Sequence, residues 1–246
     1  MIDTHAHLDM IKKSYLDELI ENAKSVGVKT IVTQSVNIPS LSPSLEIANK
    51  YPEIVKFSAG LYPEETLKES DFDKLKEFVM KNKDQVFAIG EIGMDFSREL
   101  PGKELQEKIF RQQLELAEEL NVPVSIHTRK AEKEIIEILK EYPNVKKVLH
   151  CFCGKKRLAL EAEKIGCYFS VPTNIVRAHN FQDLVRYIPK EKILTETDTP
   201  YLSPFKEKNN ESAFISETIK TISKYWEMSE EEVDNQIESN FNKIYF

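Results

Sequence analysis

The chain contains only three cysteines among its 246 residues, and this scarcity excludes a fold held together by a disulfide framework. An odd number of thiols in a chain of this size is typical of a reducing compartment. No apolar run approaches the roughly 18 residues that a transmembrane helix needs. The residues after Met1 form neither a basic nor an apolar leader region. These absences predict a cytoplasmic protein without a membrane partner.

An excess of basic residues is also missing. The 34 Lys and Arg are outnumbered by 41 Asp and Glu, and the net charge is -7 at pH 7. The surface as a whole therefore does not attract polyanions, and any nucleic-acid footprint must be local. No internal repeat or low-complexity linker interrupts the chain. We expect a single domain over residues 1–246, a length typical of one α/β barrel.

Short apolar runs alternate with longer amphipathic stretches along the chain, the pattern of repeated βα units. Eight alternations predict a parallel sheet closed into a (β/α)8 TIM barrel, with an open doubly wound sheet as the alternative. The expected strands are Met1–His5, Thr30–Gln34, Val55–Ala59, Val86–Ile89, Val122–Ile126, Lys147–His150, Tyr168–Val171 and Ile193–Glu196. The expected helices are Ser14–Val26, Leu41–Lys50, Phe72–Asn82, Glu104–Leu120, Lys133–Tyr142, Lys155–Ile165, Asn180–Tyr187, Ala213–Tyr225 and Ser229–Asn240.

The sequence His5-Ala6-His7 at the end of the first expected strand is the first sign of a metal site. Side chains two residues apart on a strand point the same way, so both imidazoles project together. Two neutral imidazoles on one face can hold a divalent metal ion. The pattern alone is weak evidence, because a single histidine at a strand end is more often a hydrogen-bonded structural residue.

Further metal-binding residue types follow the ends of other expected strands, where a barrel carries its reactive groups. Four of the five histidines lie at such ends. A single zinc usually takes three protein ligands and a water. Four imidazoles and two carboxylates therefore suit two divalent ions that share a bridging carboxylate. The expected ligands are His5, His7, Glu91, His127, His150 and Asp198.

Two of these ligands are also the expected catalytic residues. Asp198 is an acidic group beside the metals, so it can take the proton of an attacking water. Glu91 is expected to lie where that water is held between the ions. Asp95, four residues further on, is expected to accept a hydrogen bond from a ligating histidine.

Two cations follow His127 at the expected rim of the barrel. Arg129 and Lys130 can form a phosphate clamp, because a guanidinium makes paired contacts with phosphate oxygens. A solvated helix start explains the same two residues equally well, and the sequence leaves both interpretations open.

Cys151 and Cys167 are not expected to bind metal. If His150 faces the mouth of the barrel, strand alternation turns Cys151 toward the helices. We therefore expect Cys151 and Cys167 to be buried apolar thiols. The position of Cys153 in a loop leaves its role open.

The sequence resembles the TatD-type metal-dependent deoxyribonucleases, a branch of the amidohydrolase-like barrels. The matching motifs run in the family's order over almost the whole chain. They are Asp3-Thr4-His5-Ala6-His7-Leu8-Asp9, Gly90-Glu91-Ile92-Gly93-Met94-Asp95, Ile126-His127-Thr128-Arg129, His150-Cys151-Phe152-Cys153-Gly154 and Glu196-Thr197-Asp198-Thr199-Pro200-Tyr201-Leu202. The resemblance implies a distorted (β/α)8 barrel and a divalent-metal nuclease, since several members are 3′–5′ exonucleases on DNA. It also implies metal ligands at the same six positions.

Three departures from the family pattern stand out. The family's histidine in a Gly-x-His-Pro motif is replaced by Tyr62, a frequent glycine by Pro172, and a usual proline by Ser212. A phenol donates a hydrogen bond but is not cationic at pH 7. The first departure therefore bears on the substrate and on the rate of the reaction.

The leading hypothesis is a deoxyribonuclease with two divalent ions (Mg, Mn or Zn) that hydrolyses phosphodiester bonds of single-stranded DNA or DNA ends. In it, Arg129, Lys130 and Tyr62 bind the substrate phosphate. A small-molecule amide, ester or phosphoester hydrolase of the amidohydrolase superfamily is the alternative, because a fold does not fix a substrate. Glu91 lies where two-metal relatives often carry a modified lysine, which favours the nuclease. A non-catalytic binding protein is a third hypothesis, and the full ligand set argues against it.

Overall fold

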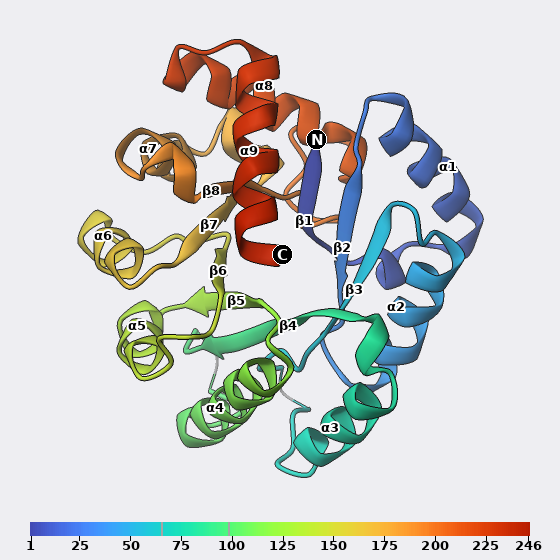
Figure 1. The fold of residues 1–246 in the computed structure, drawn as a ribbon, viewed down its shortest axis with the longest axis vertical. Helices are drawn as coiled ribbons and strands as arrows, with labels where there is room; N and C mark the ends of the chain where they lie inside the picture. Colours follow the sequence, from blue (N-terminus) through green and yellow to red (C-terminus); the bar gives the residue numbers. More distant parts are fainter. Residues whose placement is uncertain (65, 98) are drawn as a thin grey trace.

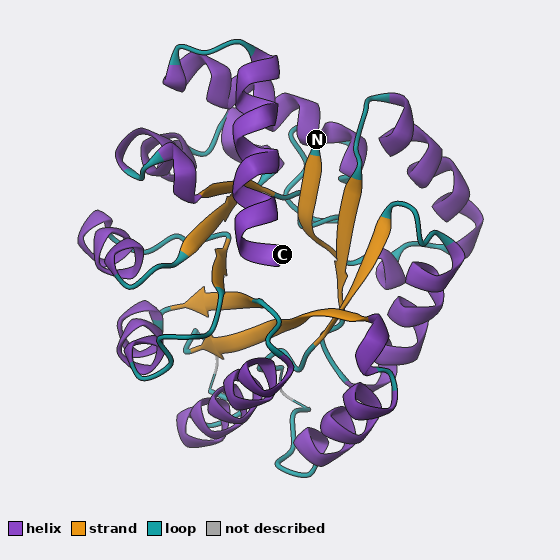
Figure 2. Ribbon diagram, viewed as in Figure 1, coloured by secondary structure: helices purple, strands orange, loops and turns teal. Residues whose placement is uncertain are grey.

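The computed structural model describes residues 1–64, 66–97 and 99–246. Eight strands form one parallel sheet in which each strand pairs with the next along the chain, and helices surround the sheet (Figures 1 and 2). The strands are β1 Ile2–Ala6, β2 Thr30–Gln34, β3 Val55–Ala59, β4 Val86–Asp95, β5 Val124–Arg129, β6 Lys147–His150, β7 Tyr168–Val171 and β8 Ile193–Thr195. The α-helices are α1 Lys13–Ser25, α2 Ile38–Lys50, α3 Asp71–Lys81, α4 Lys103–Leu120, α5 Glu132–Lys140, α6 Lys156–Lys164, α7 His179–Tyr187, α8 Ile215–Trp226 and α9 Glu230–Tyr245.

The barrel closes where β1 meets β8 and the loop after it. The peptide of His7 donates to the carbonyl of Thr199 at 2.9 Å, and the peptide of Asp198 donates to the carbonyl of His5 at 2.9 Å. A single isolated bridge joins Ala6 to Thr199. The closed barrel is confirmed and the open sheet is wrong, although the seam makes this barrel a distorted one.

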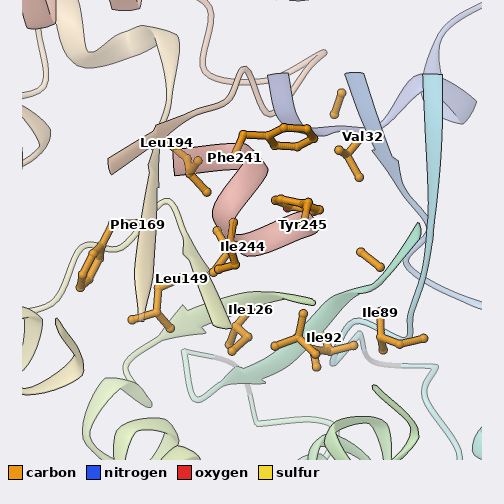
Figure 3. Packing of buried hydrophobic residues seen from close by; sticks show 14 of the residues in the cluster. Val32, Ile89, Ile92, Ile126, Leu149, Phe169, Leu194, Phe241, Ile244 and Tyr245 are labelled. Carbon is orange, nitrogen blue, oxygen red and sulfur yellow. The ribbon is translucent and has the colours of Figure 1, made fainter. Parts of the chain in front are cut away.

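Helix α9 covers the amino ends of the strands. Phe241, Ile244 and Tyr245 project from it among the barrel strands (Figure 3), and Tyr245 stacks on Phe87 at the start of β4 with ring centroids 5.2 Å apart. The side chain of Asn240 donates to the carbonyl of Ile193 at 2.7 Å. This end of the barrel is filled, so the carboxyl ends of the strands remain for a site.

Strands β4 and β5 continue three or more residues past their expected ends. Strand β4 extends to Asp95 because residues 92–95 pair with residues 126–129 of β5. Glu91 and His127 therefore lie inside strands rather than at their tips. Gly93 allows this close pairing, since its φ is 141° and an added Cβ would lie 2.1 Å from the carbonyl oxygen of His127. Within the described residues, no helix combines the length and hydrophobicity that crossing a membrane requires.

Candidate metal centre

Side chains from four strands and two loops converge at the carboxyl end of the barrel, in a cavity of about 440 Å³. The structure brings together all six ligands expected from the sequence. Three overlapping groups of three among them have ligand atoms within 4.8 Å of one another. The six residues are His5 on β1, His7 just after it, Glu91 on β4, His127 on β5, His150 on β6 and Asp198 after β8.

Glu91 lies between two pairs of histidines. Its Oε1 is 3.1 Å from Nδ1 of His127 and 3.1 Å from Nε2 of His150. Its Oε2 is 3.6 Å from Nε2 of His5 and 3.5 Å from Nε2 of His7. Each carboxylate oxygen thus faces its own pair of imidazoles. This geometry fits a carboxylate that bridges two divalent ions.

Asp198 approaches the cluster from the loop after β8. Its Oδ1 lies 3.4 Å from Nε2 of His7 and 3.9 Å from Nε2 of His5. The residue has a φ of 60°, in the left-handed region that aspartate and asparagine tolerate better than most residues. The backbone here is held by the hydrogen bond to the carbonyl of His5. Asp198 therefore points its carboxylate at the β1 histidines.

The charges of the cluster suit metal ligation. Burial opposes ionisation of Glu91, but the facing imidazoles, His150 foremost, hold its pKa well below its usual range. Burial lowers the pKa of His5, which keeps that ring neutral and able to ligate. Burial also acts on His7, yet the carboxylates of Asp198 and Glu91 raise its pKa. The centre thus combines an ionised Glu91 with a neutral His5 and a more basic His7.

The rings of His5 and His7 are each contacted on the side away from Glu91. Nδ1 of His5 lies 2.9 Å from Oγ of Ser125, and Nδ1 of His7 lies 3.3 Å from the carbonyl of Gln34. These contacts leave Nε2 of both rings turned toward Glu91. Such outer contacts fix the tautomer and orientation of a metal-ligating histidine.

The ring of His127 is turned the other way. Its Nδ1 faces Glu91, while its Nε2 lies 3.6 Å from Oδ2 of Asp95 and 3.4 Å from the hydroxyl of Tyr62. Tyr62 donates to Oδ2 of Asp95 at 3.2 Å. The expected position of Asp95 behind a histidine of the centre agrees with this arrangement. Tyr62 also lines the cavity, so it contacts both this histidine and the space for a substrate.

Glu196 is a functional candidate that the sequence analysis missed. It is fully buried and accepts hydrogen bonds from the peptide and the thiol of Cys151 at 3.0 and 2.8 Å. Its second oxygen accepts from Oγ of Ser170 at 2.5 Å. A signal existed, because Glu196 ends the expected strand Ile193–Glu196, at the rim where a barrel carries its reactive groups.

The prediction for Cys151 is wrong. Its thiol lines the cavity and contacts Glu196 instead of facing the helices. The reason is a φ of 46° at this residue, which ends the strand alternation directly after His150. Cys167 is buried as expected, and Cys153 is exposed.

Of the two cations expected to bind phosphate, Arg129 lines the cavity and Lys130 does not. Arg129 ends β5 and lines the cavity. Lys130 has a φ of 55°, its peptide donates to Glu132 at 3.2 Å, and it lies outside the residues that line the cavity. The structure therefore brings Arg129 to the centre but leaves Lys130 on the outer rim.

A family model described as TatD related DNase matches residues 2–246. The chain belongs to the TatD-related DNase family. It is 32% identical over 254 residues to the uncharacterized metal-dependent hydrolase YabD of Bacillus subtilis, covering 100% of this chain and 98% of that protein. It is 31% identical over 195 residues to the 3′-5′ ssDNA/RNA exonuclease TatD of Salmonella typhimurium, covering 76% and 74% of the two chains.

The fold is also similar to that of a solved structure. The solved structure of YJJV, a TatD homolog from Escherichia coli, matches with a TM-score of 0.91 and 24% identity over 99% of this chain and 97% of that one. The protein is a metal-dependent hydrolase of the TatD family with an amidohydrolase-like barrel. The buried histidine and carboxylate cluster supplies the residues that such an enzyme needs.

Proposed function

We propose that this TatD-family hydrolase is a deoxyribonuclease that removes nucleotides from single-stranded DNA ends in the 3′–5′ direction. The observation that carries the proposal is the position of Glu91 between two pairs of histidines, which suits a two-ion site. The relative from Salmonella typhimurium with exonuclease activity in its name supports the substrate class. Mixed imidazole and carboxylate ligands accept Mg²⁺, Mn²⁺ or Zn²⁺.

Two divalent ions, when bound, lower the pKa of water and offset the charge that grows on an attacked phosphorus. The protein's own residues do the rest. Asp198 accepts the proton of the attacking water, and Glu91 keeps the two halves of the site at a fixed separation. Arg129 holds non-bridging phosphate oxygens from the rim of the cavity. Tyr62 steadies His127 and Asp95 from the substrate side.

Degradation of DNA oligomers labelled at the 3′ or the 5′ end tests this proposal, with added Mg²⁺, Mn²⁺ or Zn²⁺ and an EDTA control. Asp198→Asn is the matched blank, since asparagine accepts the φ of 60° and preserves the shape of the side chain. We expect a metal-dependent ladder that shortens from the 3′ end and is lost in Asp198→Asn. Full activity of Asp198→Asn would remove this residue from the mechanism.

A small-molecule hydrolase is the second candidate. The cavity of about 440 Å³ falls within the range of small-molecule sites, roughly 300–1,000 Å³, and the net charge of -7 does not favour a polyanion. Hydrolysis of a cyclic amide or a simple ester far faster than any DNA strand, with metal bound, would favour this candidate over the nuclease.

A further inference from the structure

A second and larger hollow opens beside the metal centre. It has a volume of about 700 Å³ and lies between α1 and residues 200–211, the loop after β8. We call it the α1 groove, and its lining residues include Met10, Lys12, Tyr15, Tyr201, Asn209 and Glu211. Met10 and Tyr201 also line the cavity of the metal centre. The two spaces therefore adjoin at these two side chains.

Exposed apolar side chains gather around the α1 groove. Tyr15 is 57% exposed, Tyr201 54% and Met10 41%. The hydroxyl of Tyr201 contacts Sδ of Met10 at 3.6 Å, and its ring centroid lies 6.4 Å from that of His7. Single exposed apolar residues are ordinary, but these three line one hollow beside the metal centre.

The side chain of Tyr15 is largely exposed. Among the described residues, no hydrogen bond, ion pair or ring contact engages its side chain. It stands in the first turn of α1 on the side of the groove. An aromatic face left open in this way is available to stack on a planar ligand.

The polar groups of the α1 groove are of mixed kind. Lys12 brings a cation without an ion-pair partner among the described residues, and Asn209 brings an amide. Glu18 and Glu211 each bring a carboxylate, and that of Glu211 accepts a hydrogen bond from Asn22 at 3.0 Å. Such a lining does not suit a row of phosphates. It suits nucleobases, whose amino groups and ring acceptors pair with carboxylates, amides and cations.

We infer that the α1 groove binds the nucleotides of single-stranded DNA that adjoin the scissile bond, with bases stacked on Tyr201 and Tyr15. This inference rests on the proposed nuclease function and extends it to the length of the substrate. The lining that it shares with the metal-centre cavity selects this occupant, since a strand held at the metal centre extends over the neighbouring surface. Stacking on aromatic rings tolerates any base, as a nuclease without sequence preference requires.

If the α1 groove binds DNA, the protein should bind and cleave a long strand better than a dinucleotide. We expect a dinucleotide to occupy the metal centre alone, whereas a strand of about twelve nucleotides is more than long enough to reach both spaces. The first measurement is the fluorescence anisotropy of a labelled strand of that length, titrated with metal-loaded protein in the Asp198→Asn background to suppress cleavage. The second is the ratio of kcat/KM for that strand to kcat/KM for a dinucleotide, in the otherwise wild-type chain.

Three variants sharpen both measurements. Tyr15→Ala removes the ring, Tyr15→Phe keeps it, and Met80→Ala removes an apolar side chain on α3 that is exposed to 41% but lies outside the groove. We expect Tyr15→Ala to weaken binding of the long strand about tenfold and to lower the kcat/KM ratio by a similar factor. Tyr15→Phe and Met80→Ala should match the parent protein.

The outcomes separate this inference from the proposed function. Unchanged binding of the long strand by Tyr15→Ala, or an equal loss of binding in Met80→Ala, overturns the inference that the α1 groove binds DNA. A parent protein that cleaves neither substrate but binds the long strand through Tyr15 removes the nuclease proposal and supports the groove. Cleavage of both substrates with a kcat/KM ratio unaffected by Tyr15→Ala supports the nuclease and overturns the groove.

Discussion

The carboxylate of Glu196 lies 3.5 Å from Nδ1 of His150, while Nε2 of the same ring faces Glu91 at 3.1 Å. Burial opposes the charge of Glu196, but His150 outweighs it and holds the pKa of the carboxyl at about 2. An ionised carboxylate in this position fixes the ring with Nε2 toward the centre and makes that nitrogen a better ligand. We therefore regard Glu196 as a positioning residue for His150.

Replacing Glu196 by glutamine should weaken metal binding without unfolding the chain. Loss of such an outer partner typically costs 10- to 100-fold in metal affinity, so we expect a rise of about that factor in the Kd of the divalent ion. Titration of metal-free protein against a chromophoric chelator measures it. Cys151→Ser is the matched control, because its hydroxyl still donates to Glu196 and leaves the charge in place. Equal losses in both variants would contradict a role for the carboxylate charge.

His7 and His179 provide a second matched pair. His7 lies 3.5 Å from Glu91 and 3.4 Å from Asp198, whereas His179 begins α7 and contacts Gln182 at 3.0 Å outside the cluster. We expect elemental analysis to find two ions per wild-type chain and per His179→Ala chain, and fewer than two in His7→Ala. Two ions retained in His7→Ala would exclude His7 as a ligand.

Chelation of the loaded wild-type protein should also lower its melting temperature. A ligand at about a hundred times its Kd stabilises the folded state by about 2.7 kcal/mol, which corresponds to roughly 5–10 °C in a chain of this size. His179→Ala should show the same shift as wild type on addition of EDTA. His7→Ala should show a smaller one.

Much of this centre was predictable because it depends on local rules. Parallel strands alternate with amphipathic helices, and the ends of such strands meet at one rim. The convergence of His5, His7, His127 and His150 follows from those two facts. Strand boundaries were recovered best where short apolar runs end at turn residues, as in residues 147–150.

The other features of the site depend on tertiary contacts that a sequence pattern does not reveal. Strand alternation placed Cys151 wrongly, because a φ of 46° at that residue breaks the two-residue period. The extension of β4 past Glu91 depends on the close pairing at Gly93 with His127. The α1 groove exists because α1 packs near residues 200–211, which are almost two hundred positions away in the chain. Such features require the tertiary structure.

Substitutions of the two adjacent cations, Arg129 and Lys130, test which of them binds the substrate phosphate. Arg129 lines the cavity and Lys130 does not. We expect Arg129→Gln to raise the KM for a DNA strand about tenfold, because a charge-assisted phosphate contact is lost. Lys130→Asn removes the neighbouring charge while tolerating the φ of 55°, and should change KM little. Steady-state kinetics on one labelled strand measures both, and a larger effect from Lys130→Asn would reverse the assignment.

Asp3 makes the stability of the fold depend on pH. It is fully buried and accepts hydrogen bonds from the peptide and hydroxyl of Thr197 and from the hydroxyl of Ser212, at 2.9, 2.7 and 2.7 Å. Burial outweighs these bonds and raises the pKa of Asp3 to about 7. The folded chain therefore keeps a proton that the unfolded chain releases from about pH 4 upward.

The contribution of Asp3 to the free energy of unfolding must then fall as the pH rises from about 4 to about 7, by an amount on the order of 4 kcal/mol. Asp3→Asn removes the titrating group, and the nearby hydroxyls can rotate to pair with its amide. Urea unfolding of metal-free wild type and Asp3→Asn at pH 5 and pH 7.5 measures the difference. We expect the free energy of unfolding of Asp3→Asn, relative to wild type, to be higher at pH 7.5 than at pH 5. Parallel pH profiles for the two chains would show that Asp3 is ionised in the folded state across this range.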